Sequence, residues 1–212
     1  FNKLGFRCDE FALVSELPVV FLGCSHTEGT GLPLEEVWSH KLITKIQNVT
    51  GKFIPFWNLA MAGSSIDTQA KHLYWFCQDH KIKYIFSYFP VFYRREYCYE
   101  TDNIKIWAPL YGVKDPAVNK AFTDREFAIH QTMRSLMIID SVRKNNDAIM
   151  YSAKWGDTPK EGYPILEHFP EMNYFEEVII STEMARDNLH YGPTFHTELA
   201  EAFWKIFDNQ TK

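Results

Sequence analysis

Two short segments of the chain carry residue types that could perform acyl transfer together. Ser25 lies in the glycine-rich stretch Gly23–Gly31, and a tight turn of this kind can expose a hydroxyl and aim backbone N–H groups at a developing oxyanion. Asp187 precedes His190 by three residues, so its carboxylate can hold one ring nitrogen while the other faces a serine. Each segment alone also fits a plain structural turn. Together they contain the nucleophile, base and orienting carboxylate that serine hydrolysis needs.

The elements that must position these residues alternate between strands and helices. Short apolar runs predict five β-strands, at Leu17–Leu22, Phe53–Leu59, Tyr84–Phe89, Ala148–Ser152 and Glu177–Ile180. Helical periodicity predicts helices at 33–51, Ser65–Asp79, Pro116–Asn145 and Thr194–Phe207. We interpret Phe92–Asp115 and Gly156–Met172 as segments without regular structure. The alternation favours an α/β fold with a parallel sheet that helices cover on both faces.

Parallel strands place their carboxyl ends at one edge of the sheet, and ligands bind there. Ser25 follows the first predicted strand, and the small-residue turn that includes Gly63 follows the second. Gly63 has no side chain to keep its N–H away from a substrate. Asp187 and His190 precede the last helix, and their loop can lie at the same edge. We therefore expect one site at this edge.

These blocks resemble the SGNH (GDSL-like) hydrolase family along nearly the whole chain. The Gly-Asp-Ser turn of the family is similar to residues 23–25, its oxyanion glycine is similar to Gly63, and its final Asp-x-x-His is similar to Asp187 and His190. The resemblance implies a three-layer, flavodoxin-like α/β/α sandwich with a five-stranded parallel sheet, formed by a single domain over residues 1–212. It also implies an oxyanion hole built from the N–H groups of Ser25 and Gly63.

The sequence departs from the family pattern at two places. Cys24 stands where the family has Asp, and the stretch 87–96 lacks the Asn that supplies the third donor of the oxyanion hole. Pro90 in that stretch has no N–H to donate. The hole then has two backbone donors, or it takes a third from Ser87, Tyr93 or an arginine. One lost donor costs about 10²–10³ in rate.

Arg94 and Tyr93 follow the third predicted strand, and we predict that both bind substrate. Arg94 and Arg95 could hold an anionic group bidentately, or they could form an ion pair with Glu96. Tyr93, together with Trp57, Trp107 and Tyr191, could offer faces for sugar stacking, although core packing is the simpler interpretation for most of these rings.

Other polar residues near the two segments have plainer interpretations. We expect Cys24 to pack in the interior rather than act as a nucleophile, because adjacent side chains point apart. His26 is expected to be a polar residue at the rim of the site, and His196 to cap or pack the last helix. Glu28 could orient the turn or contact substrate, and a solvated carboxylate is the simpler alternative.

Composition and charge exclude several classes of function. The chain has 212 residues, 46% of them hydrophobic, 16% aromatic and 23% charged, with a net charge of -5. No basic face for a nucleic acid is evident, and no apolar run approaches the roughly 20 residues that span a bilayer. The four cysteines are widely spaced and form no Cys-x-x-Cys pair, which predicts reduced thiols. Histidine spacing predicts no metal site, and we expect no cofactor. The cellular compartment stays open.

We therefore predict a serine esterase that hydrolyses small acyl esters through Ser25, His190 and Asp187 and an acyl-enzyme. The family resemblance implies an O-acetyl group on a carbohydrate as substrate. Two alternatives stay open: a catalytically weak or inactive carbohydrate-binding module with the same fold, and an O-acyltransferase that uses the same residues.

Overall fold

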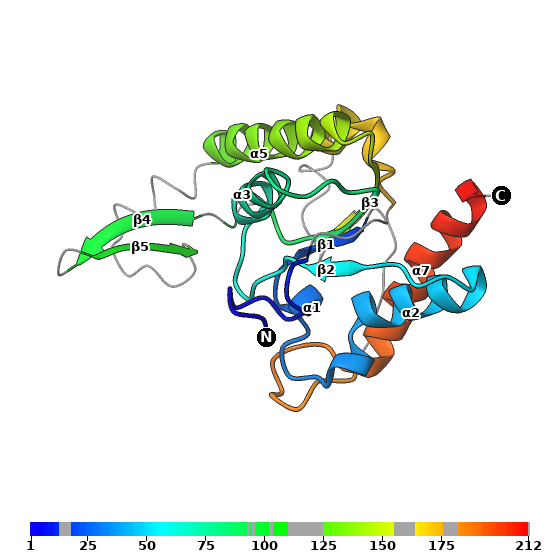
Figure 1. Cartoon of the computed structure of the whole chain (residues 1–212). Helices are drawn as coiled ribbons and strands as arrows, with labels where there is room; N and C mark the ends of the chain where they lie inside the picture. The colour runs from blue at the N-terminus through cyan, green and yellow to red at the C-terminus, as the bar shows by residue number, and fades with distance from the viewer. Residues whose placement is uncertain are drawn as a thin grey trace.

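The computed structural model describes residues 1–12, 18–92, 94, 96–101, 104–109, 125–154, 164–175 and 182–211. Within these ranges, four parallel strands form one sheet: β1 (Val19–Gly23), β2 (Phe56–Asn58), β3 (Tyr84–Phe89) and β6 (Ile149–Lys154), in the order β2-β1-β3-β6 (Figure 1). A separate antiparallel pair consists of β4 (Glu96–Thr101) and β5 (Ile104–Pro109). Since all four strands of the main sheet are parallel, their carboxyl ends lie at one edge.

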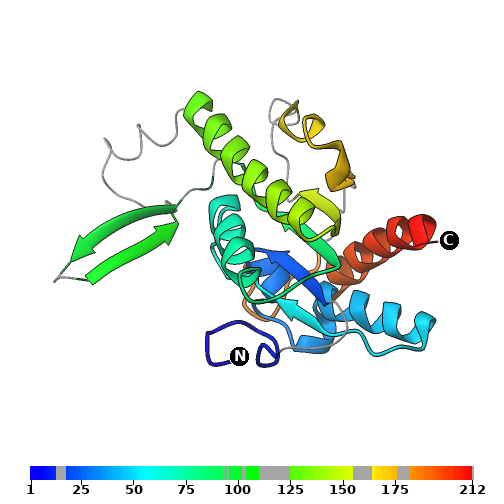
Figure 2. The same ribbon diagram turned by 45° about the horizontal axis from the view of Figure 1, so that its top comes forward.

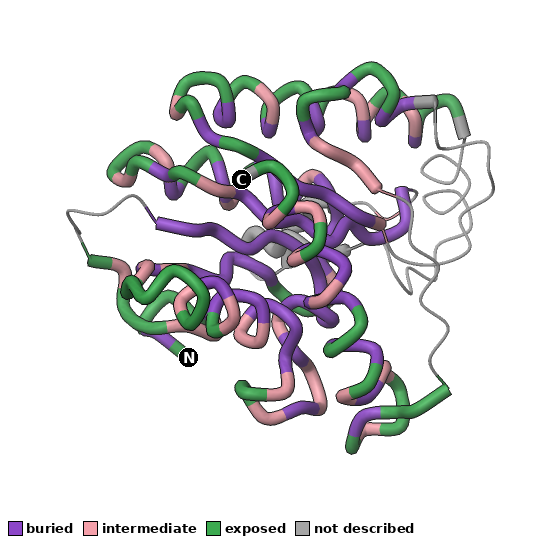
Figure 3. The backbone as a smooth tube through the Cα atoms, turned by 90° about the vertical axis from the view of Figure 1, so that its right-hand side faces the viewer, coloured by how far each residue is buried: buried purple, intermediate pink, exposed green. Residues whose placement is uncertain are grey.

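Helices cover both faces of this sheet. One face carries α3 (Ile66–Phe76) and α5 (Arg125–Asn145), which pack on each other, and the opposite face carries α2 (Trp38–Thr50) and α7 (Pro193–Thr211) (Figure 2). Figure 3 shows the strands as a buried layer between helices that expose their outer sides. The chain therefore has the predicted three-layer α/β/α architecture.

Alternate residues of each strand supply the two cores, as the two-residue period of a strand requires. In β1, Val20 and Leu22 belong to the core beneath α3 and α5, whereas Val19 and Phe21 belong to the core beneath α2 and α7. All five residues of β1 are buried, because both its faces are covered and β2 and β3 flank it. This explains why the strand is a continuous apolar run.

The structure agrees with most of the predicted elements and corrects some boundaries. β2 is an edge strand, as the preceding Pro55 suggests. The predicted helix at 33–51 is a short 3₁₀ turn, η1 (Leu34–Glu36), followed by α2, because Val37 adopts an extended backbone with ψ 136°. Ser65 caps α3 instead of lying inside it, and it forms a capping box with Thr68. The fifth predicted strand, 177–180, lies outside the described residues.

Two segments predicted to lack regular structure contain some. The antiparallel hairpin β4–β5 occupies part of the stretch Phe92–Asp115 and projects from the body of the molecule (Figure 1). Short helical turns, α6 (Pro164–Glu167) and η3 (Pro170–Met172), occupy the end of the second stretch. The hairpin has a signal in the sequence, since two β-prone runs flank Asp102-Asn103.

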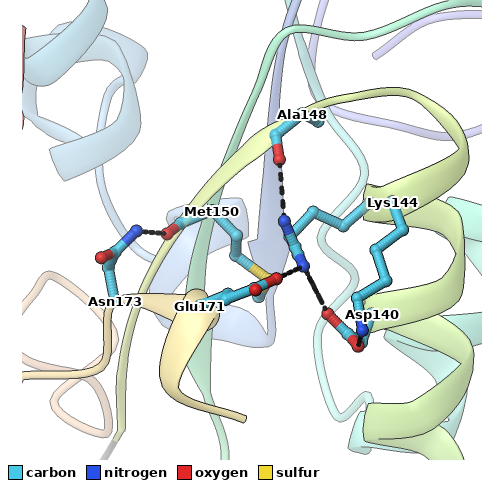
Figure 4. Close-up of polar contacts among 7 residues, drawn as sticks. Asp140, Lys144, Ala148, Met150, Glu171 and Asn173 are labelled. Carbon is cyan, nitrogen blue, oxygen red and sulfur yellow. Dashed lines mark hydrogen bonds and ion pairs between the residues drawn. The ribbon is translucent and has the colours of Figure 1, made fainter.

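A buried arginine ties the outer layer to the sheet. Arg143, near the end of α5, donates from Nε to Asp140 Oδ1 at 2.9 Å and from Nη1 to the carbonyl of Ala148, and it pairs with Glu171 on η3. Beside it, Asn173 donates to the carbonyl of Met150 in β6 at 2.8 Å (Figure 4). A buried guanidinium must be paired in this way, so we assign this cluster a structural role.

Candidate active site

The Ser25 turn follows β1 without a linker. The strand ends at Gly23, and Ser25 is the first residue of a one-turn helix, α1 (Ser25–Glu28), with Cys24 as its N-cap. A Cβ atom added at Gly23 would lie 2.0 Å from Thr27 Oγ1, so only glycine allows the helix to begin this close to the strand. The first N–H groups of a helix have no partner within it. The Ser25 N–H therefore has no partner within α1, and Ser25 itself is 9% exposed.

The other end of this turn is held by an arginine from the N-terminal segment. Arg7 donates to the carbonyls of Glu28, Gly29 and Leu32, the last at 2.6 Å. Glu28 accepts a hydrogen bond from Thr30 Oγ1 at 2.8 Å. Its carboxylate therefore helps to orient the turn, which is one of the roles considered for it from the sequence. Sequence reasoning missed Arg7, because its partners lie 21 to 25 residues away and no local pattern connects them.

The second turn, after β2, is bonded directly to the first. Asn58 donates from Nδ2 to the carbonyl of Thr27 at 2.7 Å, and Ser64 donates from Oγ to the carbonyl of Gly23 at 2.7 Å. Gly63, beside Ser64, has a positive φ of 78°. The structure therefore brings the predicted oxyanion glycine to the turn that bears Ser25. Asn58 and Ser64 were not predicted as site residues.

Asp187 and His190 form a hydrogen-bonded pair. The ring Nδ1 lies 2.6 Å from Asp187 Oδ2, and the N–H groups of Leu189 and His190 donate to Oδ1 at 3.0 and 3.1 Å. Both side chains are partly exposed, 22% for His190 and 26% for Asp187. Nδ1 must carry a proton to donate to the carboxylate, so in the neutral ring Nε2 is an acceptor. This is the tautomer that a general base requires.

The loop that holds this pair contacts the Ser25 turn. A Cβ atom at Gly31 would lie 3.0 Å from the Asp187 carboxylate, so glycine makes room for Asp187 here, and the Arg186 N–H approaches the Gly31 carbonyl at 3.4 Å. The loop closes on itself through an antiparallel bridge between Met184 and Tyr191. Figure 1 shows it in orange below α1 and α2. No hydrogen bond among the described residues joins the Ser25 hydroxyl to the His190 ring.

Two histidines, His26 and His196, are buried at this site, and only the first was predicted to lie at its rim. His26 is 4% exposed, so the prediction of a rim residue is wrong. The reason is that α1 turns residue 26 inward, against the aromatic rings of the loop and of α7. His196 is 1% exposed and packs within α7 as expected, but its Nδ1 accepts the N–H of Trp38 at 3.1 Å and so caps α2 rather than its own helix.

Charges at the site are strongly influenced by burial and hydrogen bonding. Hydrogen bonds from the Leu189 N–H and then from the His190 ring lower the pKa of Asp187 to about 2. Burial, followed by the charges that His196 and His190 would carry, lowers the pKa of His26 to about 3. Burial also lowers the pKa of His196 to about 3. At neutral pH, Asp187 is therefore ionised and these two histidines are neutral.

The residues in or after the third predicted strand, namely Arg94, Tyr93 and Ser87, have three different outcomes. Arg94 lies at the same edge, where its Nη1 approaches the Ser64 carbonyl at 3.5 Å, and Tyr93 lies outside the described residues. Ser87 is fully buried and donates to Gln69 Oε1 at 3.0 Å, so its hydroxyl is engaged away from an oxyanion.

Two further candidates are buried in the interior. Cys24 is 1% exposed, as predicted for a packing residue, and is a free thiol. Trp57 is 3% exposed and belongs to the core, so it offers no stacking face to a sugar. In the described ranges, no group of three or more His, Cys, Asp or Glu side chains could hold a metal ion.

Comparisons with known proteins identify the fold. An esterase, EstA from Pseudoalteromonas sp., matches with a TM-score of 0.61 at 10% identity, over 92% of this chain and 99% of that chain. A family 3 carbohydrate esterase from Clostridium thermocellum matches with a TM-score of 0.54 at 14% identity, over 90% and 94%. A member of the lipolytic protein G-D-S-L family from Veillonella parvula matches with a TM-score of 0.52 at 10% identity, over 91% and 98%.

The protein thus has the SGNH-type α/β/α fold that the sequence resemblance implies. In sequence, no family model and no curated protein matches the chain. Within the described ranges, the helices are too short or too polar to cross a membrane.

Proposed function

We propose that this protein is a serine esterase that hydrolyses small acyl esters through Ser25, His190 and Asp187. The observation that carries the proposal is the 2.6 Å contact between His190 Nδ1 and an ionised Asp187, in a loop that packs on the turn beginning at Ser25. An imidazole held in this way keeps Nε2 free to accept a proton from a serine hydroxyl. Hydrogen bonds of this kind are often long without substrate and shorten when it binds.

The reaction proceeds through an acyl-enzyme. Ser25 Oγ attacks the ester carbonyl while its proton passes to His190 Nε2, and the protonated ring then returns that proton to the departing alcohol. Water, deprotonated by the same ring, attacks the acyl-enzyme and releases the acid and Ser25. Asp187 stays ionised throughout and stabilises the imidazolium that forms in each half-reaction.

The oxyanion is stabilised by backbone donors from both turns. The N–H of Ser25 lies at the start of a helix, and the N–H of Gly63 lies in the turn that is bonded to it. Preorganised N–H groups of this kind stabilise developing charge because they need not reorient during the reaction. Arg94, beside Ser64, is proposed as a substrate contact together with Tyr93.

An O-acetyl group on a carbohydrate is the substrate class that we propose. The fold shared with a carbohydrate esterase supports it. Tyr191 is the aromatic residue that we propose as a sugar contact, since it is partly exposed and adjoins His190. A small acyl group also suits a nucleophile that is 9% exposed and flanked by two tight turns.

Labelling by a fluorophosphonate tests the nucleophile directly. We expect the reagent to modify Ser25 in the wild-type protein, and the Ser25→Ala variant to lose both labelling and hydrolysis of an aryl acetate by at least about 10³-fold. Cys24→Ala is the matched control, because it changes the neighbouring buried side chain and should keep labelling at Ser25. Unchanged turnover in Ser25→Ala would contradict the proposal.

The same experiment separates the two alternative functions. Labelling at Ser25 accompanied by faster acyl transfer to an added sugar than to water would indicate an acyltransferase. Saccharide binding without labelling and without hydrolysis would indicate a binding module.

A further inference from the structure

His26 is a buried, titratable side chain that the proposed reaction does not use. It directly follows Ser25 in the sequence and is 4% exposed. Its ring stacks on Tyr191, with centroids 5.2 Å apart and planes at 23°, and meets the His190 ring edge to face at 5.5 Å and 74°. The residue after the candidate nucleophile therefore contacts both the candidate base and the residue after it.

This stack continues into the last helix. Tyr191 stacks on Phe195 of α7, with centroids 4.6 Å apart and planes at 28°, and Phe195 also contacts His26 at 5.5 Å. Tyr88 of β3 closes the same cluster at 6.3 Å from His26. Three separate parts of the fold, namely the sheet, α7 and the loop, thus fix the plane of the His26 ring.

The groups that face this ring keep it uncharged. His196 on α7, His190 in the loop and Arg94 after β3 all oppose a positive charge on His26, and only Asp187 favours one. Burial opposes it more strongly than any of these, and the pKa is lowered to about 3. A neutral imidazole packs as an aromatic ring, and stacked or edge-to-face rings stabilise each other beyond the area they bury.

We propose that His26 is a positioning residue whose stacked ring holds His190 in place relative to Ser25. The geometry supplies the reason. His26 is bonded covalently to Ser25, and Tyr191 is bonded covalently to His190, so the His26–Tyr191 stack connects the two backbones at the point where their side chains must meet. The catalytic part of this inference rests on the proposed function, whereas the positioning of the loop does not.

Two substitutions separate ring stacking from simple space filling. His26→Phe keeps a flat ring and removes the nitrogens, whereas His26→Leu keeps apolar bulk and removes the flat ring. Phe76→Leu is the matched control, because Phe76 is a fully buried aromatic residue in the opposite core, beneath α3 and α5. It reports the effect of losing an aromatic ring without touching the His26 cluster.

Hydrogen exchange of the loop 182–192 provides a readout that needs no activity. The Ala185 N–H donates to the His190 carbonyl at 2.8 Å, and the His190 N–H donates to Asp187. We expect His26→Leu to speed the exchange of both amides by about 10-fold or more, and His26→Phe and Phe76→Leu to leave them as in the wild type. Wild-type exchange in His26→Leu would overturn the proposal. Equal acceleration in His26→Phe would overturn it too, because the flat ring would then not be the cause.

Steady-state kinetics on an aryl acetate provide the second readout. Misplacing a catalytic group by about 1 Å costs on the order of 10²-fold in rate, so His26→Leu should lower kcat by about 10²-fold with KM within about 3-fold. His26→Phe should restore kcat to within about 3-fold of the wild type. Unchanged kcat in His26→Leu would overturn the proposal. A wild-type protein without esterase activity would refute the proposed function instead, and hydrogen exchange would still decide the role of His26.

Discussion

The two carboxylate oxygens of Asp187 have separate partners, and this division explains how a loop residue can orient a histidine. Oδ1 accepts hydrogen bonds from the N–H groups of Leu189 and His190, which fix the carboxylate against the backbone of the same loop. Oδ2 contacts the His190 ring. The same bonds keep Asp187 ionised well below neutral pH. The ionised carboxylate therefore favours the tautomer of the neutral His190 ring in which Nδ1 carries the proton.

Arg94 supplies the prediction at the residue scale. Its guanidinium lies beside Ser64, next to the oxyanion turn, and a guanidinium binds carboxylates bidentately. We expect Arg94→Gln to raise KM for an ester that carries a carboxylate by about 10-fold, equivalent to about 1.4 kcal/mol, and to leave KM for a neutral acetyl ester unchanged. Steady-state kinetics on the two esters measure the difference.

Arg134→Gln is the control for this comparison, because Arg134 is an exposed arginine on α5. An unchanged KM for the carboxylate ester in Arg94→Gln, relative to the wild type, would remove Arg94 from substrate binding. A fall in kcat on the neutral ester, with KM unchanged, would instead assign it the place of the missing oxyanion donor.

At the residue scale, the sequence allows a contact to be predicted when the two partners are only a few positions apart in the chain. Asp187 and His190 are three residues apart, so their pairing follows from spacing. Asn58 and Ser64 bond to residues 31 and 41 positions away, and such contacts become visible only when the strands are assembled. The burial of His26 was mispredicted for the same reason, since the rings that cover it come from the far end of the chain.

The turns after β1 and β2 act as a unit at the scale of elements. The register of the two strands pairs Phe21 with Asn58, so the turns begin side by side. Two buried side-chain hydrogen bonds then join them, from Asn58 to Thr27 and from Ser64 to Gly23. The relative position of the Ser25 and Gly63 N–H groups therefore depends on these bonds as well as on the strands.

Ser64→Ala tests this connection. The substitution removes the donor to the buried Gly23 carbonyl, and we expect a loss of about 1–3 kcal/mol in the free energy of unfolding. We also expect kcat on an acetyl ester to fall by about 10-fold, because the Gly63 N–H loses its support and small displacements of catalytic groups are costly. Urea denaturation and steady-state kinetics measure the two effects.

Ser152→Ala is a matched control for this substitution. Ser152 is also fully buried, and its hydroxyl donates to a backbone carbonyl, that of Met172, at 3.0 Å. Both variants should lose stability, but only Ser64→Ala should lose kcat. Equal loss of kcat in the two variants would show that general destabilisation, and not the connection between the turns, is responsible.

Most elements could be predicted from periodicity, and the exceptions have physical causes. The four described strands of the main sheet are short apolar runs because both faces are covered, and Gly51 ends α2 as predicted. The break at Val37 could not be predicted, because the apolar spacing continues across it while the backbone there is extended. The hairpin β4–β5 was missed because charged residues such as Glu100 and Lys105 interrupt its two six-residue runs, unlike the continuous apolar run of β1.

At the scale of the whole molecule, the candidate site lies above the core formed by α2, α7 and one face of the sheet. Phe195 and Trp38 belong to this core, and the cluster of His26 and His196 contacts both. Trp38 also donates from its indole to Thr27 Oγ1 at 3.3 Å. Folding therefore removes two titratable imidazoles from water at the place where the core meets the site.

This burial predicts a specific dependence of stability on pH. The pKa of His26 is about 3 in the folded chain and about 6.5 in an unfolded one. Between these values the unfolded state binds more protons, so the free energy of unfolding falls as the pH is lowered below about 6.5 and continues to fall until about pH 3. At pH 5 the loss from one such histidine is about 2 kcal/mol, and His196 adds a similar amount.

His26→Phe isolates the contribution of His26 to this loss of stability at low pH. The substitution removes the titrating group and keeps an aromatic ring. Urea denaturation at pH 8 and pH 5 should show that the loss of unfolding free energy between the two pH values is smaller in His26→Phe than in the wild type, by about 2 kcal/mol. His168→Asn, at an exposed position, is the control and should lose as much as the wild type. An equal loss in His26→Phe and the wild type would mean that His26 is already protonated in the folded protein at pH 5. The ring would then carry a charge beside His190, and its stacking could not be that of a neutral aromatic group.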